Sequence, residues 1–504
     1  MTPGSRAVYS CSYAFAHSLR GIMNSSMKRR SQVIGLFVLA LLTAVPVLAQ
    51  NAPQPGGETP LLPAGVPPLP FEITQHEPID TQDDGFSSAI PIACGAGGFG
   101  TIGAAYDTDY WQFILPTQKP VVARVFAMEG GSQLDATLRL YVNLGGNVEV
   151  AYSDDFDGRD PRLHHAGYPT PSYAYLQVRD HGHNDGSAGH WYVVIWDHPT
   201  YVSAKTAGTV NGFSYAPGDV LVHYECSDTW EMFFDASGVG LSLNTTGFAM
   251  YPNTQSGRFL LTFAGKGNVP QVGTVLPHDV VEFIAGDVGT DTAGVFRLFL
   301  DGSDVGLSTS GEKLDGIALD KDGEILLSTA GNGNVPGLGA FADEDVIRLD
   351  AGSYGAATTG TWSMAFDGSD VGLGGTDINS VWQSRSLTVD GYPLYFSVLN
   401  NVGLVGLAFD DDDIAVCDWL TYGPNTSCGS WSKVMNLAFL GTVDALDRGD
   451  ARVPDKYTLA GGVIEGAPID LSTSVEKVDA VAPDYSANGE ATEQNIVFVN
   501  PNSD

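Results

Sequence analysis

The octapeptide Leu300-Asp301-Gly302-Ser303-Asp304-Val305-Gly306-Leu307 decides the fold, because the chain contains it three times. It recurs as Phe366-Asp367-Gly368-Ser369-Asp370-Val371-Gly372-Leu373 and, in a more divergent form, as Phe234-Asp235-Ala236-Ser237-Gly238-Val239-Gly240-Leu241. The aspartates at 235, 301 and 367 are 66 residues apart, and Asp279-Val280-Val281 keeps the same offset from Asp345-Val346-Ile347. In the third copy, the equivalent Asp413-Ile414-Ala415 lies two residues further along the chain than the spacing of 66 predicts. A repeat of this length indicates a supersecondary unit that buries its apolar face against its neighbours.

Each repeat is expected to contain four short strands. In the second copy they are predicted at 296–300, 314–319, 324–329 and 345–349, with the turn Asp320-Lys321-Asp322-Gly323 closing the middle hairpin. Four antiparallel strands are the content of a β-propeller blade. Three complete units are too few for an ordinary propeller, and only one further strand, 431–439, is expected after them. The sequence therefore predicts a propeller-like array, with an open or otherwise closed array as the alternative.

The region before the repeats is predicted to be a β-sandwich. Short alternating or β-branched runs at 109–115, 121–128, 137–142, 173–179, 191–196 and 220–224 are broken by turn residues, and no long helical periodicity is visible. The fold class is thus all-β, a jelly-roll-like sandwich followed by the array. The expected division is a leader and signal peptide (1–49), a proline-rich linker (50–72), the sandwich (73–226), three repeats (228–294, 295–360, 361–429), a closing strand (430–448) and an acidic tail (449–504).

Four phrases within residues 76–226 resemble the bacterial pre-peptidase C-terminal domain, a β-sandwich appended to secreted hydrolases. They are Asp107-Thr108-Asp109-Tyr110-Trp111-Gln112-Phe113, Leu134-Asp135-Ala136-Thr137-Leu138-Arg139-Leu140-Tyr141, Ser153-Asp154-Asp155 and Gly189-His190-Trp191-Tyr192-Val193-Val194. In that family the domain usually follows a protease, whereas here it comes first, so the resemblance implies an accessory or surface-binding role. The repeats in turn resemble those of uncharacterised secreted bacterial proteins with the same Phe-Asp-Gly-Ser-Asp-Val-Gly-Leu phrase, and that resemblance implies no activity.

The N-terminal sequence and the charge indicate export. Lys28, Arg29 and Arg30 precede the apolar run 33–49, which ends in Val47-Leu48-Ala49, a signal-peptide pattern, and no membrane span is expected after cleavage. Asp and Glu number 59 against 24 Lys and Arg, a formal net charge of −35, which repels nucleic acid and anionic lipid. The expected location is extracellular or at the cell surface, or the periplasm if the host has an outer membrane.

Four cysteines follow the signal peptide, an even number that suggests two disulfides. Three pairings are possible. Cys417 and Cys428 flank a turn-rich stretch that can close a short hairpin, and Cys94 with Cys226 would then staple the first domain.

Acidic loops are the candidate metal sites, with calcium as the possible ion, because hard cations take oxygen ligands from carboxylates, carbonyls and water. The competing interpretation is that Asp and Ser bond their own backbone in tight turns, or that the loops are solvated. The candidate ligands are Asp154, Asp155, Asp157 and Asp160 in the sandwich, and Asp301, Asp304, Asp343, Asp345, Asp367 and Asp370 in the repeats.

No nucleophile elbow, zinc-protease helix, phosphate loop or paired Cys ligand has the correct spacing in the sequence. The leading expectation is a secreted, non-catalytic binding or structural protein that contacts polysaccharide or another extracellular protein, with an oligomeric state that the sequence leaves open. The alternative is an extracellular metal-dependent hydrolase, in which Asp343 and Asp345 would hold the metal. A third possibility is a self-associating surface-layer component. An enzyme is expected to bring carboxylates of different repeats together around one pocket.

Overall fold

The computed structural model describes residues 71–447, apart from 78–84, 116–118, 129, 155–159, 166–170, 252–256, 321–322, 385–392, 405–406, 438–441 and a few side chains; residues 69, 484–485 and 491–492 are also described. The expected leader, most of the linker and nearly all of the acidic tail lie outside these residues. The described chain is all-β, with two short 3₁₀ turns. It contains no helix that is long and apolar enough to span a membrane.

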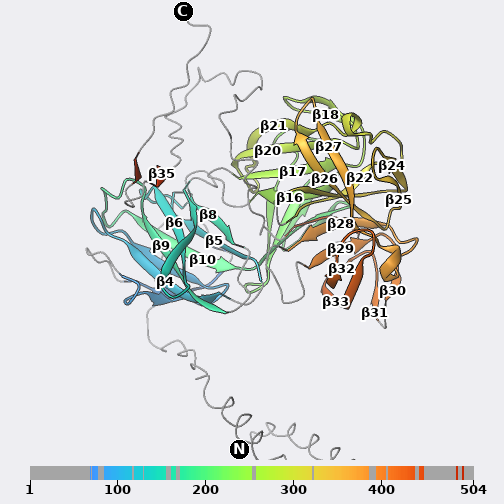
Figure 1. The fold of residues 1–504 in the computed structure, drawn as a ribbon. Coiled ribbons are helices and arrows are strands. Elements are labelled where there is room, and N and C mark those ends of the chain that lie inside the picture. The colour runs from blue at the N-terminus through green and yellow to red at the C-terminus, as the bar shows by residue number, and fades with distance from the viewer. Residues whose placement is uncertain are drawn as a thin grey trace, which may run out of the picture. The chain divides into compact units, whose positions relative to one another are not determined.

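The first part is a sandwich of two five-stranded sheets (Figure 1). One sheet has the order β1-β3-β10-β5-β8 and the other β2-β4-β9-β6-β7. Trp111, Tyr192 and Trp196 lie in the core between them; burial alternates along β4, whereas every residue of the central strand β10 is buried. The strands are β1 (Ile73–His76), β2 (Ile90–Pro91), β3 (Gly97–Thr101), β4 (Asp109–Leu115), β5 (Val121–Phe126), β6 (Ala136–Asn143), β7 (Asn147–Ser153), β8 (Arg162–His165), β9 (Ser172–Asp180) and β10 (Trp191–Asp197).

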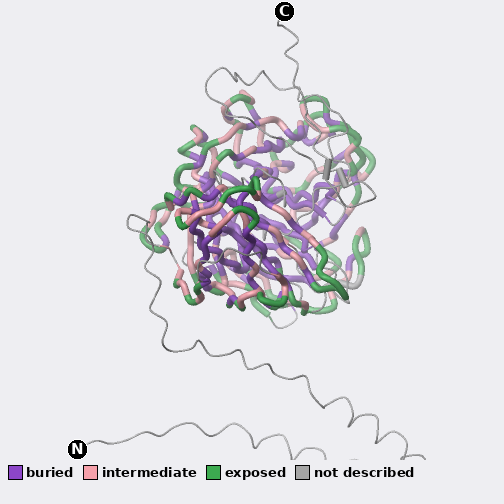
Figure 2. The backbone as a smooth tube through the Cα atoms, turned by 90° about the vertical axis from the view of Figure 1, so that its left-hand side faces the viewer, coloured by how far each residue is buried: buried purple, intermediate pink, exposed green. Residues whose placement is uncertain are grey.

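The rest of the described chain forms four four-stranded antiparallel sheets, each with a small two-stranded hairpin. The sheets have the orders β34-β11-β14-β15, β16-β17-β20-β21, β22-β23-β26-β27 and β28-β29-β32-β33. Their inner strands, β16, β22, β28 and β34, contact one another in a closed sequence, so the four sheets surround a common centre. The array is therefore propeller-like and closed, and the described residues of β22 and β28 are all buried. Buried segments form the interior of the molecule, and exposed ones gather at its periphery (Figure 2).

The bounds of these strands follow the chain through the array. They are β11 (Pro199–Ala204), β12 (Gly208–Val210), β13 (Phe213–Tyr215), β14 (Val220–Tyr224), β15 (Thr229–Phe234), β16 (Thr245–Tyr251), β17 (Arg258–Phe263), β18 (Gly267–Val269), β19 (Gly273–Val275), β20 (Val280–Asp287), β21 (Ala293–Leu300), β22 (Leu314–Leu319), β23 (Ile325–Thr329), β24 (Gly333–Val335), β25 (Gly339–Phe341), β26 (Val346–Ser353), β27 (Thr359–Phe366), β28 (Ile378–Gln383), β29 (Leu394–Val398), β30 (Val402–Leu404), β31 (Leu407–Phe409), β32 (Asp413–Thr421), β33 (Ser427–Asn436) and β34 (Val443–Asp447).

Two strand assignments differ from the sequence expectation. Residues 220–224 form β14, which pairs with β11 and β15 in the array and does not close the sandwich. Residues 431–439 were expected to begin the closing strand, but Ser427–Asn436 is the outer strand of the fourth sheet, and the closing strand is β34, which pairs with β11. The reason is that the sequence repeats and the sheets begin at different strands. The first strand of a sequence repeat, such as β21, is the outer strand of the preceding sheet. The first sheet therefore takes three strands from residues 199–234 and its inner strand from the far end of the array.

Disulfides join Cys94 to Cys226 and Cys417 to Cys428, with Cα–Cα distances of 5.7 and 5.6 Å. This is the pairing that the hairpin argument favoured. Cys226 lies in the β14–β15 turn of the array, and Cys94 precedes β3 of the sandwich, so the first disulfide fastens the two parts together.

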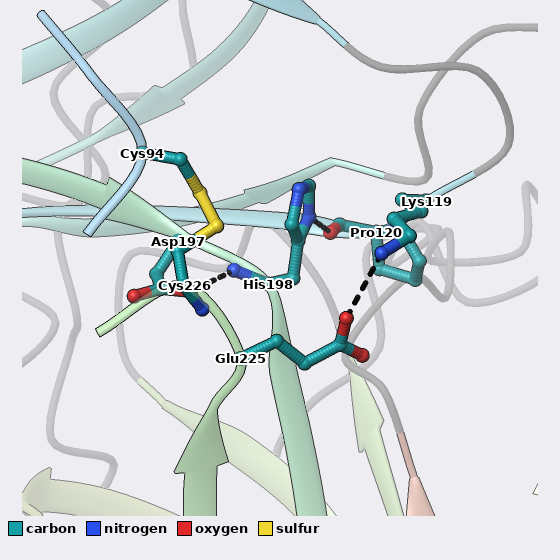
Figure 3. Close-up of polar contacts among 7 residues, drawn as sticks. All are labelled: Cys94, Lys119, Pro120, Asp197, His198, Glu225 and Cys226. Carbon is teal, nitrogen blue, oxygen red and sulfur yellow. Dashed lines mark hydrogen bonds and ion pairs between the residues drawn. A yellow bond between two sulfur atoms is a disulfide. The ribbon is translucent and has the colours of Figure 1, made fainter. Parts of the chain in front are cut away.

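Polar contacts around Cys94 and Cys226 reinforce this fastening (Figure 3). The Asp197 carboxylate accepts the backbone N–H groups of His198, Cys226 and Ser227 at 2.7, 2.8 and 3.0 Å. Because Asp197 ends β10 and His198 leads into β11, this carboxylate fixes the point where the chain passes from the sandwich into the array.

Candidate functional site at the centre of the array

A β-bulge occurs at the same position near the start of every inner strand. The pairing register shifts around residue 246 in β16, 315 in β22, 379 in β28 and 444 in β34. A bulge leaves one residue without a ladder partner. The bulged residues are Thr246, Asp315, Asn379 and Asp444, and each is less than a tenth exposed. The next residue is always small, Gly247, Gly316, Ser380 or Ala445, and a Cβ on Gly316 would lie 3.1 Å from Ser380 Cα of the neighbouring inner strand. Close contact between inner strands therefore restricts this position to small residues.

Side chains near these bulges bond one sheet to the next. Thr246 donates from Oγ1 to the Leu314 carbonyl of β22 at 2.9 Å, and Asn379 donates from Nδ2 to the Val443 carbonyl of β34 at 2.7 Å. Both acceptors are the first residue of the following inner strand. Ser203 Oγ forms a similar bond to the Thr245 carbonyl at 2.9 Å. Three of the four seams between sheets are thus joined by a neutral donor and a backbone carbonyl.

The fourth seam, between β22 and β28, contains two carboxyl groups instead. Asp315 Oδ1 accepts a hydrogen bond from Ser328 Oγ at 2.8 Å, and the Asp315 side chain lies within hydrogen-bonding reach of Asp377, the residue before β28. Asp315 Oδ2 and Asp377 Oδ1 are buried and have no hydrogen-bond partner in the described structure. Each aspartate is 8% exposed. This pair, with Asp343 and Asp444, is called the axial acidic cluster below.

Burial and mutual repulsion perturb the pKa values in this cluster. Burial, followed by the neighbouring Asp377, raises the pKa of Asp315 well above its usual range. Burial and then the charge of Asp343 raise the pKa of Asp377 to about 6, although Lys205 opposes the shift. Burial also raises the pKa of Asp444 to about 6, against the opposing effects of Lys205 and Asn379. Without a cation, Asp315, Asp377 and Asp444 therefore take up protons at a higher pH than an exposed aspartate does.

We expect the metal-free protein to lose stability as the pH rises from 5 to 8. The folded-state pKa values of Asp377 and Asp444 are raised above the unfolded value of about 3.9, so the folded state binds these protons more tightly. The stabilisation is therefore greatest at acid pH and is lost as the pH passes through about 6. Each group contributes a loss of about 1 kcal/mol over this range. Urea unfolding in EDTA at several pH values measures it, and Asp444→Asn should flatten the profile; an identical profile in that variant would refute the assignment.

The aspartates that the sequence singled out in the repeat turns mostly accept hydrogen bonds from nearby backbone. Asp301 Oδ1 accepts from the backbone N–H and hydroxyl of Ser303, and Asp367 Oδ1 does the same with Ser369. Asp304 and Asp370 accept the backbone N–H groups of Thr358 and Thr426 in the next sheet, at 3.0 and 3.1 Å. The contacts of Asp301 and Asp367 are those that the turn interpretation describes, whereas Asp304 and Asp370 bond a distant segment of the chain. Asp343, in contrast, belongs to the axial acidic cluster.

Asp345 joins two turns. Its carboxylate accepts the backbone N–H groups of Ala342 at 2.8 Å and Gly368 at 3.0 Å, and Asp219 and Asp279 make the equivalent pair of bonds in other sheets. Replacing Asp345 with alanine leaves two backbone donors without this acceptor. We expect Asp345→Ala to destabilise the protein by about 1–3 kcal/mol in urea unfolding, equally with and without calcium. A loss seen only in the presence of calcium would instead identify Asp345 as a metal ligand.

The sandwich candidates do not form one described cluster. Asp160 is buried and accepts the backbone N–H groups of Ala127 and Met128 at 2.8 and 2.9 Å, so it holds the end of β5. Asp154 forms an ion pair with His181 at 2.7 Å. Asp155 and Asp157 lie outside the described residues.

Another acidic group precedes β32. Asp410, Asp412 and Asp413 place carboxylate oxygens within 4.8 Å of one another. Hydrogen bonding with Asp413 and Asp412 is the largest cause that raises the pKa of Asp410 to about 6, whereas Asp413 is paired with Lys433 and accepts from Asn436. The lysine and the amide supply partners for Asp413, whereas Asp410 Oδ1 is buried without a hydrogen-bond partner in the described structure.

Comparisons with known proteins add little to this geometry. No family model matches the chain, and no curated protein matches it. Among solved structures, the chain is similar to the pre-peptidase C-terminal domain of collagenase from Bacillus anthracis, with 18% sequence identity and a TM-score of 0.18, over 23% of this chain and 98% of that one. That domain belongs to the family that residues 76–226 resemble in sequence. A TM-score this low does not support a statement about the fold or the function of this chain.

Proposed function

We propose that the protein is an exported, non-catalytic binding or structural component of the cell surface or extracellular space. The observation that carries this proposal is the firm attachment of the sandwich to the closed array. A disulfide joins Cys94 to Cys226, and the Asp197 carboxylate binds three backbone N–H groups at the same place. A scaffold of two covalently linked parts suits a protein that presents surfaces to a partner, and structural disulfides are typical of oxidising surroundings.

The sandwich offers one exposed surface for such a partner. Ile114 of β4 and Tyr173 of β9 are directly paired across the sheet, and their side chains are 52% and 40% exposed. An exposed aromatic side chain beside an aliphatic one can stack on a sugar ring or contact an apolar protein surface. Trp191, Trp196 and Tyr175 are buried in contrast, so they serve the core.

Pull-down of the mature chain on insoluble polysaccharides and on extracellular matrix protein tests the proposal. Binding should fall at least tenfold in Tyr173→Ala, and Leu407→Ala, at an exposed position of β31 in the array, serves as the control. Turnover of ester, phosphate or glycoside substrates by the wild-type chain would overturn the non-catalytic assignment. Concentration-dependent light scattering in the absence of any partner would point instead to a self-associating surface layer.

One observation favours the second candidate, an extracellular metal-dependent hydrolase. Carboxyl groups from different sheets, Asp315, Asp377 and Asp444, lie around the centre of the array, as a catalytic site built on repeats would require. If this candidate is correct, hydrolysis should require a divalent cation and should be abolished in Asp315→Asn.

A further inference from the structure

The seam between β22 and β28 lacks the bond that joins the equivalent seams. At the bulge position, Thr246 and Asn379 each donate a hydrogen bond to the first carbonyl of the next inner strand. Asp315 occupies the same position, and once its carboxyl group is ionised it has no proton to donate. The seam then has no side-chain donor equivalent to Thr246 or Asn379, and the backbone N–H of Ile378 still donates to the Asp343 carbonyl at 3.0 Å.

The atoms at this seam indicate which species fits. Asp315 Oδ2 and Asp377 Oδ1 are buried oxygens without a hydrogen-bond partner in the described structure, and they belong to two carboxyl groups that face each other from neighbouring sheets. Two ionised carboxylates this close repel one another unless a positive species lies between them. Asp343 adds further negative charge at Asp377, and the charge of Lys205 acts on both Asp377 and Asp444.

The described residues at this seam offer oxygen ligands. The Ser328 hydroxyl, which donates to Asp315 Oδ1 at 2.8 Å, lies beside the two carboxyl groups, and water would complete the set. Carboxylates, hydroxyls, amide oxygens and backbone carbonyls are calcium ligands, and calcium accepts an irregular set of six to eight of them, whereas magnesium requires near-octahedral geometry. Soft or borderline metals would favour sulfur or imidazole, and neither belongs to the axial acidic cluster.

We propose that Asp315 and Asp377 together bind a calcium ion, which bridges β22 and β28 and completes the fourth seam of the array. The site is separate from the repeat turns and from the Asp410–Asp413 group. It extends the proposed function, because the link between β22 and β28 of the scaffold would then depend on calcium. It does not depend on whether the protein is catalytic.

The chain itself supplies the matched variant. Asparagine occupies the equivalent position in β28, where Asn379 donates to the Val443 carbonyl, so Asp315→Asn can make the same bond to the next strand and is expected to fold. Asp301→Asn, in a repeat turn whose carboxylate accepts from Ser303, is the control for calcium binding elsewhere.

The test uses the mature full chain after EDTA treatment, with calcium chloride as the titrant and magnesium chloride for comparison. Calorimetry should show a calcium site that is lost in Asp315→Asn and in Asp377→Asn and is retained in Asp301→Asn. Calcium at one hundred times its dissociation constant should raise the melting temperature of the wild type and of Asp301→Asn but not that of Asp315→Asn. The absence of any calcium effect on the wild type would overturn the proposal and leave a shared proton as the link, and so would an unchanged titration in Asp315→Asn. Neither result bears on polysaccharide binding through Tyr173, so failure here is distinguishable from failure of the proposed binding function.

Discussion

A chain that ends after Phe439 should fail to form the closed array, whereas a chain that ends after Arg448 should fold. The shorter chain lacks β34, which is the inner strand of the first sheet and pairs with β11 from Tyr201 to Ala204. Val443, Ala445 and Leu446 of β34 are at most 1% exposed, and Ala445 belongs to the aromatic core of the first two sheets. Loss of this strand removes about 5 kcal/mol of apolar burial and exposes the hydrogen-bonding edge of β11.

Size-exclusion chromatography and thermal unfolding of the two chains measure the difference. Because whole domains are stable by only about 5–15 kcal/mol, the shorter chain should be expanded or aggregated and should lack a cooperative transition in the array. A milder variant, Leu446→Ala, should lower the free energy of unfolding by roughly 2–5 kcal/mol without preventing folding. Equal melting temperatures for the two truncated chains would show that β34 does not close the array.

Glu231→Ala should be the most damaging single substitution of a charged residue in the described structure. Arg124 of β5 in the sandwich donates from both terminal nitrogens to the Glu231 carboxylate of β15, at 2.6 and 2.8 Å. The guanidinium also lies over the rings of Phe126 and Tyr224, and its side chain is only 9% exposed. Despite burial, Glu231 keeps the pKa of Arg124 above its ordinary value, and Arg124 in turn lowers the pKa of Glu231.

Removing Glu231 leaves a buried positive charge without its partner, which costs roughly 3–5 kcal/mol, and the 23% exposure of Glu231 places the expected loss near the lower figure. Urea unfolding is the measurement. The matched control is Glu149→Ala, which breaks the more exposed pair between Arg139 and Glu149 and should cost less than 1 kcal/mol. The double variant Arg124→Met with Glu231→Leu should recover most of the loss, because it removes both charges. A loss in Glu231→Ala no larger than that of the control would contradict this interpretation.

The repeat phrase was sufficient to predict the all-β class and the four-stranded sheets, but the first sheet was missed. Its loop Ala216-Pro217-Gly218-Asp219 matches Leu276-Pro277-His278-Asp279 in position and in the bonds of the final aspartate. The two aspartates are only 60 residues apart, not 66, and the β14–β15 turn carries Cys226 in place of a glycine-rich turn. For this reason the run from Val220 to Tyr224 was assigned to the sandwich as its closing strand. A search for the Pro-x-Asp loop before a β-branched run would have found this fourth copy.

The axial acidic cluster could not be predicted in the same way. Asp315 and Asp444 each follow the first residue of a short strand, where an acidic residue ordinarily faces solvent, and Asp377 resembles a turn residue. Their proximity depends on ring closure and on a bulge that no local pattern marks. Asp343 was identified, but as a partner of Asp345 in a loop site. In the structure, Asp345 accepts from the backbone, and the charge of Asp343 acts on Asp377.

Pairing of β34 with β11 also determines when the protein can finish folding. The two strands are separated in sequence by almost the whole array, so an emerging chain carries an incomplete first sheet until its last structural segment has appeared. Such distant pairing slows folding, and the open edge of β11 remains available to other chains in the meantime. A protein built in this way gains from crossing a membrane before it folds, since its synthesis is then complete when the strands first meet.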